Sequence, residues 1–321
     1  MRDIRMGTSQ FEGRDGDKAY NLGVIARLTK QAVSQGAEIV SFQEGAVTNY
    51  TFLQSLSRES LVELAEPVPN GPSVRRLIEI ANENRCVIMA GLFERDEAAR
   101  VYNTYVTVGP EGFISRFRKL HTFINRHLSN GNEYCVIDLC GCQIGFLICY
   151  DNNLPENVRA TALLGAEIIM APHVTGGLPF HEPGTTRIPR EVWDHRETNP
   201  AALRQYVEGP TGRGWLLKWL RARAWENGVY LVFSNPIGWD YDSVRPGCAM
   251  IIDPYGEVMA ESRVLGDDVV VATLAAEHLD KSLGRIFKRS RRPELYQVLT
   301  KPQESVIEVA WQVDTKGPET R

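Results

Sequence analysis

Several features that mark out large classes of proteins are scarce in this sequence of 321 residues. The first residues, MRDIRMGTSQF, contain no long apolar run of the kind found in a secretory signal, and no later segment approaches the length of a membrane span. The 6 cysteines are too few for a disulfide scaffold and are expected to be thiols in a reducing compartment. These absences predict a cytoplasmic protein that does not associate with a membrane.

Positive charge is in short supply as well, since 36 Lys and Arg stand against 40 Asp and Glu, for a formal net charge of −4. A chain with this balance offers no basic surface to nucleic acid or to an anionic membrane, and we expect neither as a partner. Hydrophobic residues make up 43% of the chain and charged residues 24%, as in ordinary globular proteins. An α/β enzyme is compatible with this composition.

Strand-like and helix-like segments alternate from the start of the chain. Apolar spacing predicts strands at residues 3–10, 38–43 and 86–93, and helices at 17–35 and 73–84. Two hairpins are expected around the turns Gly109–Gly112 and Asp253–Gly256. Pro at the second position of each turn and Gly at the fourth suit a type I turn.

A short segment occurs twice in nearly the same form. Residues 36–40 read GAEIV and residues 165–169 read GAEII, and each copy follows a helical pattern, opens a strand and precedes one of the hairpins. This repetition indicates two similar halves. Glu44 and His173 would then occupy matching places at the ends of matching strands.

Two segments depart from this rhythm. Residues 176–214 are rich in Gly, Pro and charge with little periodicity, which predicts a long excursion over the surface, and such loops are often functional. A buried helix is expected to follow, at residues 215–228. Residues 301–321 read as a polar C-terminal tail, peripheral or serving as an oligomer arm.

Cys149 stands at a junction where a nucleophile would be well placed. It ends the apolar run CQIGFLIC and is followed by a turn into a helix expected to start near Pro155. A junction from strand through turn to helix lifts a side chain out of the sheet and leaves backbone N–H groups beside it for an oxyanion. A buried inert thiol is the commoner fate of any single cysteine, so this context alone leaves both interpretations open.

A catalytic thiol needs a base, and none of the 6 histidines lies in an obvious companion motif. A carboxylate and an ammonium together meet the need, since one takes the thiol proton and the other stabilises the developing negative charge. Glu44 ends EIVSFQE and Lys119 ends FISRFRK, both at expected strand ends. Each of these two residues by itself is more often a solvated charge.

Taken together, three segments resemble the catalytic blocks of the nitrilase superfamily, the carbon–nitrogen hydrolases. They read EIVSFQE, FRKLH and GFLICYDNNLPENVRATALLGAEIIMAP, in the same order as in that family. The resemblance extends from about residue 3 to residue 275 and includes RARAWENGVYLVFSN and GCAMIIDPYGEVMAE. It implies a fold of the α/β class, a four-layer α-β-β-α sandwich of two pseudo-symmetric halves that spans residues 1–300.

The same resemblance implies a role for each matching residue. Cys149 would be the nucleophile, Glu44 the general base and Lys119 the stabiliser of the intermediate, with the backbone N–H of Tyr150 completing an oxyanion site. The positions that would support the nucleophile turn are Asp151, Glu156 and Arg159. No cofactor is implied. No metal is expected either, because Cys140-Gly-Cys142 is followed by no second Cys/His pair at zinc spacing.

One departure from the family pattern concerns a second glutamate, which family members commonly carry between the lysine and the Gly before the cysteine strand. Residues 120–130 contain no glutamate. Asn125 is the favoured substitute, with His127 and Glu133 as the other candidates. This departure leaves open a catalytically inactive binding protein on the same scaffold.

The surroundings of the nucleophile bear on the substrate. Nitrilases usually carry Cys-Trp-Glu where this chain has Cys-Tyr-Asp, which favours an amidase or an N-carbamoyl amidohydrolase, with a nitrilase as the alternative. Carbamoylases often place Arg where Asn152 and Asn153 stand here, so a neutral or polar substrate is expected unless an Arg arrives from residues 187–213. Tyr50 and His173 are candidates for the pocket wall or packed bystanders.

In this fold the excursion at 176–214 would form a wall or lid over the site. Its aromatic and charged residues are expected to shape specificity, namely Phe180, His181, Arg187, Arg190 and Trp193. The expected partner is a small amide or ureido substrate, and oligomers are usual in the resembled family. We expect a homodimer or a larger homo-oligomer.

Overall fold

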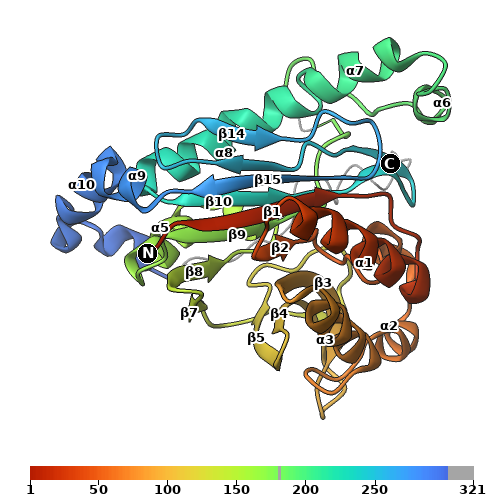
Figure 1. Ribbon diagram of the computed structural model, residues 1–321, viewed down its shortest axis with the longest axis horizontal. Helices are drawn as coiled ribbons and strands as arrows, with labels where there is room; N and C mark the ends of the chain where they lie inside the picture. Colours follow the sequence, from red (N-terminus) through yellow and green to blue (C-terminus); the bar gives the residue numbers. More distant parts are fainter. Residues whose placement is uncertain (180–181, 303–321) are drawn as a thin grey trace.

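The computed structural model describes residues 1–179 and 182–302 (Figure 1). The predicted specificity residues Phe180 and His181 and nearly all of the predicted tail, residues 303–321, lie outside the described residues. Within the described ranges no helix is both long and apolar enough to cross a membrane.

The first half of the chain forms a sheet with two covering helices. Its elements are β1 (Ile4–Gln10), α1 (Lys18–Ser34), β2 (Ile39–Ser41), α3 (Pro72–Asn84), β3 (Val87–Arg95), β4 (Val101–Gly109) and β5 (Gly112–Arg118). Strands β1, β2 and β3 run parallel, and β4 and β5 continue the sheet antiparallel as a hairpin. The predicted strands, helices and hairpin of this half are therefore confirmed, to within a few residues at each end.

The second half repeats that topology. Its elements are β8 (Cys142–Phe146), α4 (Tyr150–Asn153), α5 (Pro155–Leu163), β9 (Ile168–Pro172), α8 (Arg213–Asn227), β10 (Tyr230–Ser234), β13 (Met250–Ile252) and β14 (Val258–Glu261). Strands β8, β9 and β10 are parallel, and β13 and β14 follow antiparallel. The first strand of each half also pairs with an antiparallel neighbour, β15 (Asp268–Leu274) beside β1 and β7 (Val136–Leu139) beside β8.

The repeated five-residue segment marks equivalent turns in the two halves. Gly36 and Gly165 both have positive φ, +86° and +105°, at the turn from a helix into β2 and β9. Only glycine adopts this backbone conformation without strain, so each copy keeps Gly at its first position. The predicted duplication is present in the strand order itself.

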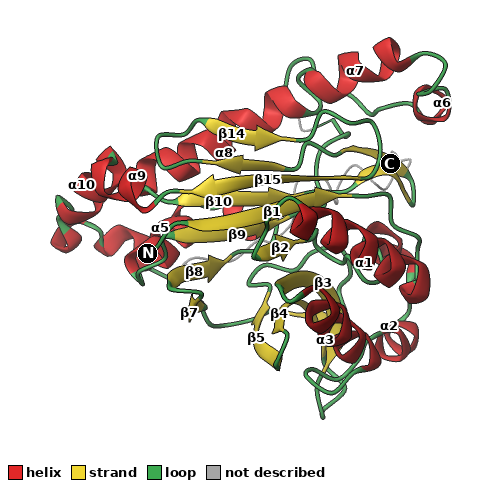
Figure 2. Ribbon diagram, in the orientation of Figure 1, coloured by secondary structure: helices red, strands yellow, loops and turns green. Residues whose placement is uncertain are grey.

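The two sheets pack face to face, and the helices cover their outer faces (Figure 2). Successive residues of β2 show the arrangement, because Ile39 packs in the core between the sheets and Val40 packs against α1 and α3. On the other side, Leu216 and Leu220 of α8 join the core of the second sheet. The four-layer α-β-β-α sandwich expected from the sequence is confirmed.

The excursion at 176–214 is more ordered than its sequence predicted. It contains α6 (Arg190–Asp194) and α7 (Pro200–Glu208), which lie at one edge of the molecule (Figure 1). Trp193 and Leu203 are buried, and Asn199 caps α7 by accepting a hydrogen bond from the N–H of Ala202. Helices this short carry too few apolar residues to give a clear periodic pattern, which is why the sequence suggested an irregular segment.

The remaining elements are short. They are η1 (Thr51–Ser55), α2 (Arg58–Leu64), β6 (Leu128–Ser129), β11 (Ile237–Asp240), β12 (Ser243–Pro246), α9 (Ala276–Lys281), α10 (Leu283–Arg289), η2 (Pro293–Leu295) and η3 (Gln297–Thr300). Strands β11 and β12 pair as a separate antiparallel ribbon.

Candidate functional site

Cys149, Glu44 and Lys119 come together between the two halves of the sandwich. Lys119 directly follows β5, whereas β2 and β8 end three residues before Glu44 and Cys149, earlier than the sequence predicted. All three side chains are almost completely buried, although two of them carry charge. Burial of charged groups is costly unless they are paired, so their mutual contacts decide the site.

Glu44 has two oxygens in different situations. Its Oε1 accepts hydrogen bonds from Lys119 Nζ and from Asn103 Nδ2, both at 2.6 Å. Its Oε2 is buried and has no hydrogen-bond partner among the described residues. The carboxylate is therefore held by one oxygen, and the other is available to take a proton. Asn103, on β4, was missed by sequence reasoning, although a polar residue inside a buried strand is itself an unusual feature.

Lys119 lies between Glu44 and two aromatic rings. Its Nζ is 3.4 Å from the Tyr50 hydroxyl oxygen and 4.7 Å from the centre of the Phe123 ring, a distance typical of a cation–π contact. Burial has the largest single effect on the pKa of Lys119 and lowers it, but Glu44, together with smaller contributions from Tyr50, Cys149 and Asp151, outweighs burial and holds the pKa well above its usual value. The side chain is thus a permanent ammonium within the site.

Cys149 sits on a strained turn. Its backbone has φ 50° and ψ −108°, a conformation rare for a residue with a side chain, and α4 begins at the next residue. The backbone N–H donates to Pro172 O at 2.9 Å, and Sγ lies 3.8 Å from Val174 O. Burial, and then the charge of Glu44, raise the pKa of this thiol to about 12, against the opposing effect of Lys119. At neutral pH the thiol is protonated.

The supporting residues differ in what they do. The buried carboxylate of Asp151 accepts hydrogen bonds from the N–H groups of His121 and Ile148, at 2.9 and 3.2 Å, so it ties the segment after Lys119 to the nucleophile turn. The other two predicted supports, Glu156 and Arg159, lie on α5. Glu156 is exposed, and Arg159 donates to Glu226 O at the end of α8 rather than to the turn.

Two predicted pocket residues, Asn152 and His173, lie behind the site. Asn152 donates to Leu147 O at 2.7 Å and lies 3.2 Å from His173 Nε2. The imidazole packs against Trp219 and Phe233, and burial holds its pKa well below the usual value, so it is neutral. These two residues are placed to brace the turn that carries Cys149 and do not line the cavity beside the sulfur.

Asn125, the favoured substitute for the second glutamate, is used elsewhere. Its amide N–H groups donate to Leu53 O at 2.7 Å and Leu56 O at 2.9 Å, and its oxygen accepts from the N–H of His127. These bonds fasten the loop after Lys119 to η1 and to the residue that follows it, and none of them reaches Lys119. Glu133, the fallback candidate, is exposed. The face of Lys119 away from Glu44 meets the rings of Phe123 and Tyr50 instead.

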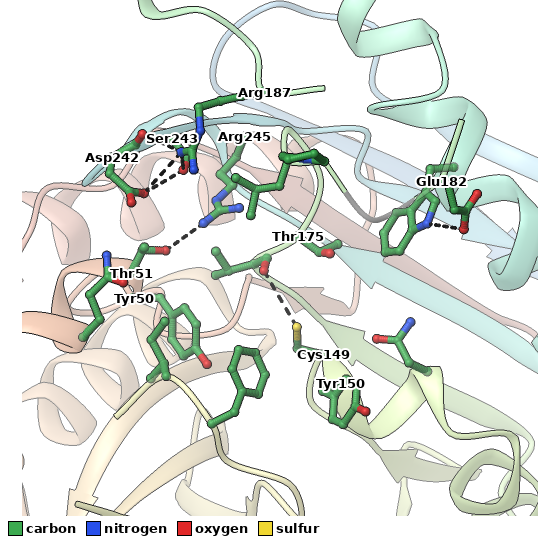
Figure 3. Close-up of a pocket in the computed structure, with 18 residues that line it drawn as sticks. Tyr50, Thr51, Cys149, Tyr150, Thr175, Glu182, Arg187, Asp242, Ser243 and Arg245 are labelled. Atoms are coloured by element: carbon green, nitrogen blue, oxygen red, sulfur yellow. Dashed lines mark hydrogen bonds and ion pairs between the residues drawn. The ribbon is translucent and has the colours of Figure 1, made fainter. Parts of the chain in front are cut away.

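A cavity of about 290 Å³ opens beside Cys149 (Figure 3). Tyr50 and Asn153, two of the candidates from the sequence, are among the residues that line it. Arg187, a candidate from the excursion, also lines the cavity. Four further lining residues were not identified from the sequence, namely Thr51, Glu182, Asp242 and Arg245. No group of His, Cys, Asp or Glu side chains in the described ranges is arranged to hold a metal ion.

Comparison with known proteins agrees on one family. The sequence pattern of the carbon–nitrogen hydrolases matches residues 5–281. A nitrilase of Pyrococcus abyssi is 29% identical over 287 residues, covering 87% of this chain and 93% of that protein. An (R)-stereoselective amidase of a Pseudomonas species is 30% identical over 257 residues, covering 79% and 78% respectively. The fold resembles that of an amidase from Nesterenkonia sp. AN1, with a TM-score of 0.69 at 20% identity, over 92% of this chain and 97% of that one.

Proposed function

This chain belongs to the carbon–nitrogen hydrolase family, and we propose that it cleaves a small amide to a carboxylic acid and ammonia with Cys149 as nucleophile. One observation carries the proposal. A buried thiol, a buried carboxylate and a buried ammonium meet in one place, and the carboxylate keeps one oxygen without a partner among the described residues.

The first half of the reaction follows from these positions. As Cys149 Sγ attacks the amide carbon, the thiol proton passes to Glu44 Oε2, because a thiol with a pKa of about 12 is not ionised beforehand. The carbonyl oxygen becomes an oxyanion, stabilised by the Lys119 ammonium and the backbone N–H of Tyr150. Glu44 then gives the proton to the leaving nitrogen, so ammonia departs and a thioester remains on Cys149.

Water completes the cycle. Glu44, again a carboxylate, removes a proton from a water molecule as its oxygen attacks the thioester carbon. The same cation and N–H stabilise the second oxyanion, and collapse expels the Cys149 sulfur, which recovers its proton from Glu44. The site returns to its starting charge, and the proposed chemistry requires no added cofactor.

A nitrile is the second candidate substrate, favoured by the 29% identity to the Pyrococcus nitrilase. The same thiol adds to a nitrile carbon and gives a thioimidate, which water converts to the acid and ammonia. A third candidate, an N-carbamoyl amine, releases carbon dioxide as well as ammonia. We favour an amide, supported by the amidase relative and by the Cys-Tyr-Asp sequence at the nucleophile.

The test compares two cysteine variants on a panel of amides, nitriles and ureido acids, with ammonia and carbon dioxide as readouts. Cys149→Ala should lose turnover while its circular dichroism and melting temperature stay close to those of the wild type. Cys248→Ala is the matched control, because Cys248 is also buried and its pKa is also raised to about 12. Amide hydrolysis that survives in Cys149→Ala would refute the assignment of the nucleophile.

The cellular location and the oligomeric state expected from the sequence are also proposals. We propose a cytoplasmic location, supported by six cysteines that all carry free thiols. We also propose a homodimer or larger homo-oligomer, supported by exposed apolar side chains gathered near the end of the described chain, at Leu283, Ile286, Leu295, Val298 and Leu299. Light scattering on the purified protein tests the second proposal, and a monomer at micromolar concentration would contradict it.

A further inference from the structure

The wall of the cavity beside Cys149 is mostly apolar. Both halves of the sandwich contribute to it, and its aromatic and aliphatic members are Tyr50, Phe123, Ile124, Tyr150, Val174, Leu178, Pro179 and Trp215. A wall of this kind gains from burying apolar surface and gives orientation through a few polar groups. The charged groups of the wall therefore decide whether a charged substrate can also bind favourably.

Arg187 is the cation that the sequence left open, and it already has protein partners. Its Nη1 donates to Ser243 Oγ at 2.6 Å and to Asp242 O at 3.0 Å. The Asp242 carboxylate lies 3.9 Å from the guanidinium and accepts a hydrogen bond from Ser243 Oγ at 2.6 Å. Figure 3 shows this group at the end of the cavity away from Cys149.

Arg245 is still more firmly committed. Its guanidinium is buried and donates to Asp240 Oδ2 at 2.9 Å, to Thr51 Oγ1 at 2.9 Å and to Gly176 O at 3.1 Å. Asp240 is buried too and also accepts hydrogen bonds from Thr51. This cluster fastens the loop after Glu44 to the ribbon of β11 and β12, and it leaves the positive charge of Arg245 neutralised.

Glu182 is the remaining negative charge on the wall, apart from Asp242. Its carboxylate pairs with Lys218 Nζ and accepts a hydrogen bond from Trp215 Nε1 at 3.2 Å. Among the described residues that line the cavity, two cations and two anions are therefore present, and each has a partner of opposite charge. The net charge of the described wall is zero.

We propose that, among small amides, the site selects uncharged ones whose acyl group is apolar and bulkier than acetyl, such as an aryl-bearing or branched alkyl group, and discriminates against acyl groups that carry a carboxylate or an ammonium. This inference rests on the proposed function. An ionic acyl group gives up its hydration on entry, and with every described wall charge already paired it meets no net attraction in return. An apolar acyl group packs against the aromatic and aliphatic side chains and has no ionic hydration to give up.

The test uses the intact enzyme and four primary amides, with ammonia release giving kcat/KM for each. The compounds are 3-phenylpropanamide, its para-carboxylate, its para-aminomethyl analogue and acetamide. We expect the kcat/KM for 3-phenylpropanamide to exceed that for each of the other three amides by about tenfold or more. A higher value for the carboxylate, for the ammonium analogue or for acetamide overturns the inference while leaving the proposed function intact. If none of the four amides is hydrolysed, both this inference and the proposed function are overturned.

A pair of variants tests the role of charge pairing. Asp242→Asn removes the counter-charge of Arg187, and the ratio of kcat/KM for the para-carboxylate to that for 3-phenylpropanamide should rise about two- to fivefold, as fits a partly exposed ion pair. Asp242→Glu keeps the negative charge and should leave the ratio near the wild-type value. A ratio unchanged in Asp242→Asn, or raised equally in both variants, contradicts the proposed pairing.

Discussion

Replacing Glu44 by Gln should make the Cys149 thiol react faster with an electrophile and should at the same time slow amide hydrolysis. The carboxylate is the second largest reason, after burial, that the pKa of Cys149 is raised to about 12. Gln is nearly the same size and removes the negative charge, whereas Lys119, which lowers the pKa, stays. The thiolate should therefore be more populated and react faster with a neutral electrophile, while the variant lacks the proposed general base.

The size of the pKa change follows from the Coulomb energy. A unit charge about 4 Å away contributes about 4 kcal/mol at an effective dielectric constant near 20, and one pKa unit corresponds to about 1.4 kcal/mol. Side-chain rearrangement around Gln reduces the effect, so we expect the pKa to fall by about one to two units. Because the wild-type pKa of Cys149 lies far above neutral, each unit by which the pKa falls raises the thiolate fraction at pH 8 about tenfold.

The assay is pulse alkylation with iodoacetamide, read at the Cys149 peptide by mass spectrometry, since the other five cysteines are also free thiols. In the wild type the rate should keep rising well beyond pH 9, without a plateau near the usual thiol pKa. In Glu44→Gln the rate at pH 8 should rise about 10- to 100-fold, and amide hydrolysis should fall by about 100-fold or more.

Glu38→Gln serves as the control, because Glu38 is a partly exposed carboxylate paired with Arg2. It should leave both readouts near the wild-type values. Alkylation of Glu44→Gln that is unchanged or slower would refute the view that this carboxylate keeps the thiol protonated. Hydrolysis that survives the substitution would remove Glu44 as the general base.

Two further variants separate catalysis from structure. Lys119→Met leaves the Glu44 carboxylate buried without its cation, so urea unfolding should show a loss of about 3–5 kcal/mol, together with loss of turnover; a variant as stable as the wild type would contradict the pairing. Asn125→Ala removes two bonds to the carbonyls of Leu53 and Leu56, which should lower the unfolding free energy by about 1–3 kcal/mol and leave the pH profile of kcat unchanged. A shifted profile in Asn125→Ala would instead support a place for this amide in the proton path.

The arrangement of strands and the identity of the three central residues were accessible from the sequence. Apolar periodicity and turn chemistry act over a few residues, so β1, α1, α3 and the hairpins were predicted within a few positions of their ends. The repeated segment led to the pseudo-symmetric halves in the same way. Glu44, Lys119 and Cys149 stood out as residues at expected strand ends, and the resemblance of the three surrounding segments to the nitrilase superfamily brought them together as candidates.

Apart from the meeting of Glu44, Lys119 and Cys149, which the family resemblance implied, contacts between distant segments could not be predicted. Asn103 meets Glu44 across 59 positions of sequence, and which side chains of β4 face that carboxylate depends on the pairing register of the sheet. Asn125 looked suited to Lys119 by spacing alone, yet the carbonyls of Leu53 in η1 and of Leu56 just after it take its donors. Local spacing does not reveal which acceptors a loop will meet after folding.

The sequence by itself therefore determined the family of this protein and led to the proposed set of a thiol, a carboxylate and an ammonium. Only the tertiary structure decided how charge is distributed around that thiol. Arg187 lies in the segment that the sequence left open as the source of a carboxylate receptor, but Asp242 pairs with it in the folded chain, and Asp240 likewise pairs with Arg245. Charge pairing depends on distances of a few ångströms between segments far apart in sequence, and these distances exist only once the two halves have packed.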